Sequence, residues 1–126
     1  MRPRTLAEVA ALVAQGHSFN LALFEFLDEF YEAPNASSLE SEPQRLASAL
    51  LETGPVIDCY LAAVAEDLGQ RFNLPTPQWA GAEDRKLRRP WFASSLASLR
   101  AVLIRESPPA FRSRNLFVSE NALSRA

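Results

Sequence analysis

The strongest constraint on the fold is the spacing of apolar residues between positions 19 and 32. On a helical wheel they gather on one broad face, which carries Phe19, Leu23, Phe26, Leu27, Phe30 and Tyr31. The narrow opposite stripe carries the acids Glu25, Asp28, Glu29 and Glu32. Apolar residues at steps of three and four are typical of an amphipathic helix with one buried side. The pattern predicts a core helix with a solvated acidic back.

Similar spacing predicts further helices along the chain. The expected helices cover residues 6–15, 19–32, 42–53, 55–72 and 95–106. The first begins with a capping box of Thr5 and Glu8, in which each side chain satisfies a free amide of the helix start. Gly54 is expected to close the third helix, and the two prolines after Ser107 end the last one. A final helical turn is expected after Ser119.

The remaining segments contain little that indicates a sheet. Residues 73–82 are expected to form an extended connector rather than a disordered linker, because Trp79 within it needs a surface to pack on. The apolar run of residues 116–118 fits either a strand or coil. The sequence therefore predicts an all-α fold, with one domain of about five helices over residues 1–126 and an extended connector containing proline and tryptophan.

The helix patterns also predict which side chains meet in the core. We expect one core to contain Leu23, Phe26, Leu27, Phe30, Ile57, Leu61, Val64, Leu68, Leu99 and Leu103. The 126 residues, 48% of them hydrophobic, are enough to build one such core.

The cellular compartment is predicted from the single cysteine, Cys59, which cannot form an intramolecular disulfide. No stretch reaches the roughly twenty apolar residues of a membrane span. These observations predict a cytoplasmic protein.

Charge is distributed unevenly along the chain. Residues 1–82 have a net charge of −7, whereas residues 83–126 have a net charge of +5. Such a division fits either a C-terminal part that meets something acidic or a fold in which the acidic part neutralises the basic one. For a compact domain we favour the second explanation.

The residues needed for catalysis are scarce. His17 is the only histidine, so no Ser or Cys has a recognisable general base beside it. The four glycines are scattered rather than gathered in a phosphate-binding loop, and one Cys with one His cannot form a zinc site. We therefore expect no enzymatic activity, no cofactor and no metal.

Two short segments concentrate proline, aromatic and arginine residues. The first is Arg88-Arg89-Pro90-Trp91-Phe92, and the second runs from Pro108 to Asn115. Because the predicted helix between them is only about 18 Å long, we expect the two segments to lie side by side. Tryptophan and arginine are enriched at interface hot spots. The candidate partner-binding residues are Trp79, Arg88, Arg89, Trp91, Phe92, Phe111, Arg112 and Arg114.

These side chains also have a structural interpretation. The aromatic residues would then anchor the core, and the arginines would pair with carboxylates such as Asp58 or Glu66. We expect a division of roles, in which Arg112 is structural and Arg89 or Arg114 faces a partner.

The C-terminal part resembles a known family. The residues that carry the resemblance are Leu74-Pro75-x-Pro77-x-Trp79, Arg89-Pro90-Trp91-Phe92 and Glu106-Ser107-Pro108-x-Ala110-Phe111-Arg112-x-Arg114-Asn115-Leu116-Phe117-Val118. They are similar, over roughly residues 57–126, to uncharacterised bacterial antitoxin-like proteins that partner nucleotidyltransferase-type toxins. Some members carry an N-terminal helix-turn-helix domain, for which we find no counterpart among these residues and which we therefore do not expect here. The resemblance implies a protein-binding role but assigns it to no residue.

Two functions follow from these observations. The first is a non-enzymatic protein-binding module, an antitoxin-like neutraliser of a partner toxin. The alternative is a nucleic-acid-binding transcriptional regulator that uses the arginine-rich C-terminal half with its interleaved aromatic residues. An acidic pI near 5.4 argues against the alternative.

Overall fold

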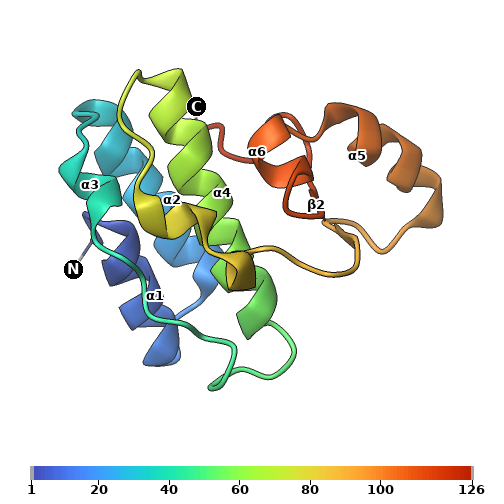
Figure 1. Ribbon diagram of the computed structural model, residues 1–126, viewed down its shortest axis with the longest axis horizontal. Coiled ribbons are helices and arrows are strands. Elements are labelled where there is room, and N and C mark those ends of the chain that lie inside the picture. The colour runs from blue at the N-terminus through green and yellow to red at the C-terminus, as the bar shows by residue number, and fades with distance from the viewer. Residues whose placement is uncertain (1, 126) are drawn as a thin grey trace.

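The first two helices form as the spacing of apolar residues predicts. The computed structural model describes residues 2–125, in which α1 spans Leu6–Ala14 and α2 spans Phe19–Glu32 (Figure 1). The predicted capping box is present at the start of α1, where the Glu8 amide donates to the Thr5 hydroxyl at 3.1 Å. Gly16 turns the chain between the helices with a φ of 101°, a conformation that glycine adopts without a steric penalty.

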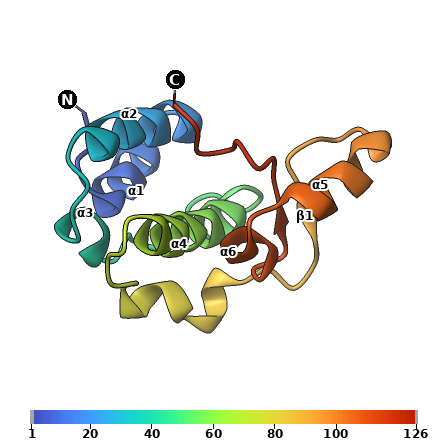
Figure 2. The same cartoon turned by 90° about the horizontal axis from the view of Figure 1, so that it is seen from above.

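The longest helix, α4, spans Gly54–Arg71 and lies in the middle of the helical part (Figures 1 and 2). Its ring contacts with α2 join Phe19 to Tyr60 and Phe30 to Phe72. The connector after α4 and the chain beyond residue 108 cover its other sides. Helix α4 is therefore covered on several sides, which explains why ten of its eighteen residues, besides its first glycine, are buried.

The all-α prediction is confirmed, and so is most of the predicted core. Eight of the ten expected residues lie in one buried cluster: Leu23, Phe26, Leu27, Phe30, Ile57, Leu61, Val64 and Leu68. The prediction was wrong for Leu99, which is 41% exposed, and Leu103 is buried outside this cluster. Both residues lie in a part of the chain that projects away from α1, α2 and α4 in both views (Figures 1 and 2).

The third predicted helix was placed wrongly. A short helix, α3, spans Ser37–Glu40, and residues 42–53 form an irregular segment followed by turns instead of a helix. The reason lies in α4, where the Asp58 carboxylate accepts hydrogen bonds from the amides of Leu46 and Ala47 at 2.7 and 3.1 Å. Asp58 is buried, although a carboxylate on a helix usually faces solvent. A Cβ at Gly54 would meet the Leu46 carbonyl oxygen at 2.1 Å, so only glycine permits this close packing.

The connector after α4 is partly helical rather than fully extended. Two 3₁₀ turns, η1 over Gln78–Gly81 and η2 over Glu83–Arg85, pack against α4. As expected, Trp79 finds a packing surface, since it is half-buried and its indole Nε1 donates to the Leu39 carbonyl at 3.1 Å.

The C-terminal part is built around two very short parallel strands. Strand β1, Trp91–Phe92, pairs with β2, Leu116–Phe117, with Trp91 opposite Leu116. Between them lie η3 at Ala97–Leu99, α5 at Arg100–Glu106 and α6 at Pro109–Arg112. The predicted helix over 95–106 is thus a shorter α-helix preceded by a 3₁₀ turn. The pairing confirms that the two proline and arginine segments lie side by side.

No helix among residues 2–125 combines the length and the apolar character needed to cross a bilayer.

The core assignment yields the first testable prediction. We expect Leu61→Ala and Phe26→Ala to lower the free energy of unfolding by about 2 to 5 kcal/mol each, because each removes a fully buried side chain. Leu99→Ala is the matched control and should change it by less than about 0.5 kcal/mol. Urea denaturation of the three variants measures the difference, and equal midpoints for Leu61→Ala and Leu99→Ala would contradict the core described here.

Candidate functional site

Three of the predicted partner-binding residues support the fold instead. Phe111 is fully buried, and its ring packs edge-on against Tyr60 at 5.0 Å. Trp79 lies under the guanidinium of Arg85, whose Cζ is 4.7 Å from the ring centroid. Arg114 is only 3% exposed. These three side chains have little or no surface to offer a partner.

Arg114 is a buried connection between segments that are distant in the sequence. Its Nη1 lies 2.6 Å from a Glu66 carboxylate oxygen on α4 and donates to the Ala110 carbonyl at 2.7 Å. Its Nη2 donates to the Ala80 carbonyl at 2.8 Å. The structural interpretation, with Glu66 as the partner, therefore holds for Arg114, and the prediction that Arg114 faces a partner was wrong.

Arg85, which the sequence shows only as part of a cluster of basic residues, is also buried. It donates to the carbonyl oxygens of Asp58 and Pro43 at 2.9 and 2.6 Å, and it lies 3.5 Å from a Glu42 carboxylate oxygen. Burial lowers the pKa of the Arg85 guanidinium. No short motif marks such a residue, because the carbonyl groups that it binds belong to residues 27 and 42 positions earlier in the chain.

The remaining predicted residues lie at the surface. Arg88, Arg89 and Arg112 are exposed, while Trp91 and Phe92 are partly buried. Arg112 forms no ion pair within residues 2–125, so these residues give no support to its predicted structural role.

Most of these surface residues belong to one projecting segment, residues 86–106, which we call the basic arm. It contains β1, η3 and α5 (Figure 1). Seven of the thirteen Lys and Arg side chains form no ion pair within residues 2–125, and six of these seven lie between Lys86 and Arg112. Glu106 is the only acid in the arm. Unbalanced positive charge is therefore concentrated on and beside the arm.

The arm also exposes large apolar side chains. Leu96, Leu99 and Ile104 are 61%, 41% and 48% exposed. At the base of the arm the Phe92 ring stacks on Phe117 at 5.1 Å, and the Arg100 guanidinium lies 5.0 Å from the Phe92 ring centroid. The sequence pattern assigned Leu99 to the core. The signal against that assignment is the shortness of the helical segment, which lies between a serine-rich stretch and two prolines.

A hollow of about 820 Å³ lies between the helical part and the strands. Its wall includes Phe19 and Phe24 of α2, Val56 and Tyr60 of α4, and Trp91 of β1. Burial raises the pKa of the Tyr60 hydroxyl to about 12, so this side chain remains protonated at neutral pH. The hollow is mainly apolar and offers room for apolar groups of a ligand or partner.

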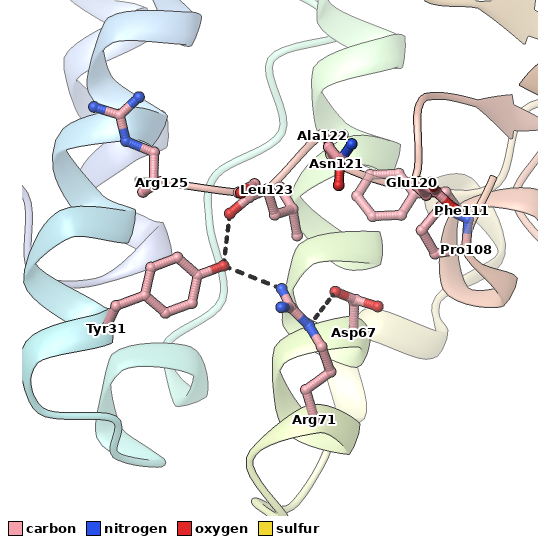
Figure 3. Close-up of a pocket in the computed structure, with 11 residues that line it drawn as sticks. Tyr31, Asp67, Arg71, Pro108, Phe111, Glu120, Asn121, Ala122, Leu123 and Arg125 are labelled. Atoms are coloured by element: carbon pink, nitrogen blue, oxygen red, sulfur yellow. Dashed lines mark hydrogen bonds and ion pairs between the residues drawn. The ribbon is translucent and has the colours of Figure 1, made fainter. Parts of the chain in front are cut away.

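A smaller, more polar hollow of about 460 Å³ is shown in Figure 3. Arg71 donates to the Tyr31 hydroxyl at 3.1 Å and to Asp67 at 2.9 Å. The Tyr31 hydroxyl in turn donates to the Leu123 carbonyl at 2.7 Å. These polar groups pair with one another, and the Tyr31 hydroxyl links them to one carbonyl of the chain that crosses this site.

The groups with potential for catalysis are dispersed. His17 is exposed in the link between α1 and α2, whereas Cys59 is buried in α4. Burial raises the pKa of the Cys59 thiol to about 11, which disfavours the reactive thiolate. Among residues 2–125 no three His, Cys, Asp or Glu side chains are grouped so that they could hold a metal ion.

Comparison of the chain with family models, curated proteins and solved structures finds no match. The resemblance of the C-terminal residues to antitoxin-like proteins therefore stays a prediction.

The contrast between two neighbouring arginines gives the second prediction. Arg114→Ala should lower the free energy of unfolding by about 3 to 5 kcal/mol, because it leaves Glu66 and the Ala80 carbonyl without their partner and removes one of two donors to the Ala110 carbonyl. Arg112→Ala, at an exposed position two residues earlier, should change it by less than about 0.5 kcal/mol. Thermal and urea denaturation would contradict this assignment if the two variants were equally stable.

The buried thiol gives the third prediction. With a pKa near 11, roughly one Cys59 thiol in a thousand is ionised at pH 8, and the surrounding side chains block access to it. We expect a thiol reagent such as Ellman's reagent to label the native protein at least a hundred times more slowly than the urea-unfolded chain. Fast labelling of the native protein would show that Cys59 is accessible and reactive.

Proposed function

We propose that the protein is a non-enzymatic binding module that holds an acidic protein partner against its basic arm. The single observation that supports this proposal is the segregation of charge: six of the seven Lys and Arg side chains without an ion pair within residues 2–125 lie between Lys86 and Arg112. Potentials of opposite sign across an interface favour association and orient the partners.

The apolar side chains of the arm suggest how such a partner would be held. Leu96, Leu99 and Ile104 expose much of their surface on a short helical segment. An acidic partner surface with an apolar groove would cover the leucines and the isoleucine and would meet the surrounding arginines at its rim. Arg89 and Arg100 are suitable hot-spot candidates, because arginine is enriched among residues that dominate binding energy.

The resemblance to antitoxin-like proteins extends this proposal to a partner class. On that basis the partner is a nucleotidyltransferase-type toxin, which the arm would neutralise by covering part of its surface. A nucleotidyltransferase-like gene beside this one would supply the candidate for a direct binding experiment.

The fourth prediction tests the arm. Partners are captured on the immobilised protein, identified by mass spectrometry and titrated individually. Arg89→Ala and Arg100→Ala should each weaken binding by more than about fivefold, corresponding to about 1 kcal/mol, while the melting temperature stays unchanged. Arg4→Ala is the matched control, because Arg4 lies outside the arm and also forms no ion pair within residues 2–125. A partner that binds all three variants equally does not use the arm.

The same charge distribution favours a second candidate, a nucleic-acid-binding regulator. Unpaired arginines near the partly exposed Phe92 ring could hold a phosphate backbone with a stacked base. In this case affinity for an oligonucleotide would fall steeply with salt, and Arg89→Ala would make that dependence shallower. Nuclease treatment of the captured material separates this candidate from a direct protein partner.

A further inference from the structure

Residues 119–125, which we call the strap, cross the space between α2 and α4 (Figure 3). The side chain of Leu123, within the strap, is buried in the core cluster, with 5% of its surface exposed. Its carbonyl accepts the hydrogen bond from Tyr31 of α2. The predicted helical turn after Ser119 is a series of turns instead.

An arginine holds the far end of the strap. Arg125 donates to both carboxylate oxygens of Asp28, at 3.0 and 3.3 Å, and its Cζ lies 4.5 Å from the centroid of the Phe24 ring. The hydrogen bonds from Arg125 lower the pKa of the Asp28 carboxyl. Both partners of this ion pair remain about one third exposed, so solvent competes with it.

The backbone of the strap is weakly tied to the helices. The amides of Ala122 and Ser124 donate to Ser119 and Asn121 within the strap itself. Within residues 2–125, the hydrogen bond from Tyr31 is the only one that joins the backbone of residues 121–125 to another part of the chain. Segments with one buried anchor and few backbone hydrogen bonds open more readily than the core elements they cover.

Open space lies on both sides of the strap. The hollow of about 460 Å³ is bordered by residues 120–125, and the hollow of about 820 Å³ is bordered by Ser119 and Ala122. Ala122 borders both, so the strap is the partition between them. Its removal would join the two hollows into one cleft, which is mainly apolar around Phe24 and Tyr60 and polar around Tyr31, Asp67 and Arg71.

We propose that this cleft is a peptide-binding site and that the strap is its internal, displaceable occupant. The strap itself shows the chemistry that the cleft recognises: an apolar side chain in the position of Leu123, a main-chain carbonyl for Tyr31, and an arginine two residues later for Asp28 and Phe24. The ligand is therefore a partner segment with leucine or a similar residue followed two positions later by arginine. Trp91 and Ala93, at the base of the arm, border the larger hollow, but the three contacts that define the ligand come from α2 and the proposal does not depend on the function of the arm.

An intramolecular occupant lowers the apparent affinity of a competing peptide by the fraction of molecules in which the site is open. The test uses a fluorescent peptide, Ser-Glu-Asn-Ala-Leu-Ser-Arg, with the sequence of residues 119–125. Fluorescence anisotropy measures its binding to the full chain and to the variant Leu123→Asp, whose own strap can no longer occupy the core. We expect the variant to bind the peptide at least tenfold more tightly than the original chain does.

The specificity of the cleft is tested with altered peptides. Replacing the peptide leucine by aspartate, or its arginine by glutamate, should weaken binding to the Leu123→Asp variant at least tenfold. Equal affinity for the original chain and the variant, or equal affinity for the three peptides, would overturn the proposal.

A milder variant keeps the test decisive if Leu123→Asp fails to fold. Arg125→Ala retains the buried leucine and removes the ion pair with Asp28, so it should fold and bind the peptide at least threefold more tightly than the original chain. Arg112→Ala, an exposed arginine outside the cleft, is the matched control and should bind the peptide as the original chain does. Thermal melts verify folding, and an Arg125→Ala variant that folds but binds no more tightly than the control would exclude a displaceable strap.

Discussion

Two buried guanidinium groups, those of Arg85 and Arg114, hold the irregular half of the protein against α4. Arg85 donates to the carbonyl groups of Pro43 and Asp58, and Arg114 donates to those of Ala80 and Ala110. Segments with little regular structure would otherwise bury carbonyl groups without partners, at a cost of about 1 to 3 kcal/mol for each. A planar group with five donors meets this need better than a single hydroxyl or amide can.

Three arginines of the C-terminal part, two of them Arg85 and Arg114, account for the neutralisation of charge within the fold. Arg114 pairs with Glu66, Arg125 with Asp28, and Arg85 approaches Glu42, so part of the basic C-terminal half neutralises part of the acidic half within the fold. These pairs leave the cations between Lys86 and Arg112 unbalanced. Both explanations of the uneven charge distribution are therefore compatible. Part of the positive charge is neutralised within the fold, and the unpaired remainder is what supports the proposal of an acidic partner.

The arm and the strap differ in how firmly they are attached. The base of the arm is tied down by the β1 and β2 pairing and by the hydrogen bonds of Leu87 and Asn115, so its position is defined by several backbone contacts. The strap depends mainly on one buried leucine, one tyrosine hydroxyl and one partly exposed ion pair. A firmly placed arm suits recognition by a preformed surface, whereas a loosely held strap suits exchange with another segment.

The sequence by itself determined the helices whose pattern is local. The spacing of apolar residues located α1, α2 and α4 to within a few residues, and with them eight of the ten expected core side chains, because a period of 3.6 residues directly encodes a buried face. Of the eight residues that the sequence suggested for partner binding, five, including Arg89 and Trp91, lie at or near the surface in the structure.

Tertiary structure alone decided the rest, because it depends on contacts between distant residues. Asp58 lies on a helix face that carries other charged residues in the sequence. Its carboxylate nevertheless accepts hydrogen bonds from two amides eleven and twelve residues earlier, and these bonds hold residues 42–53 in a non-helical conformation. Arg114 resembles the exposed Arg112 in sequence, but its carboxylate partner lies 48 residues away. Leu99 fits the apolar face of a core helix and is exposed, because the chain carries that short helix away from the bundle. Helical periodicity records which side of a segment is apolar, whereas the surface that covers this side is set only when the segments pack together.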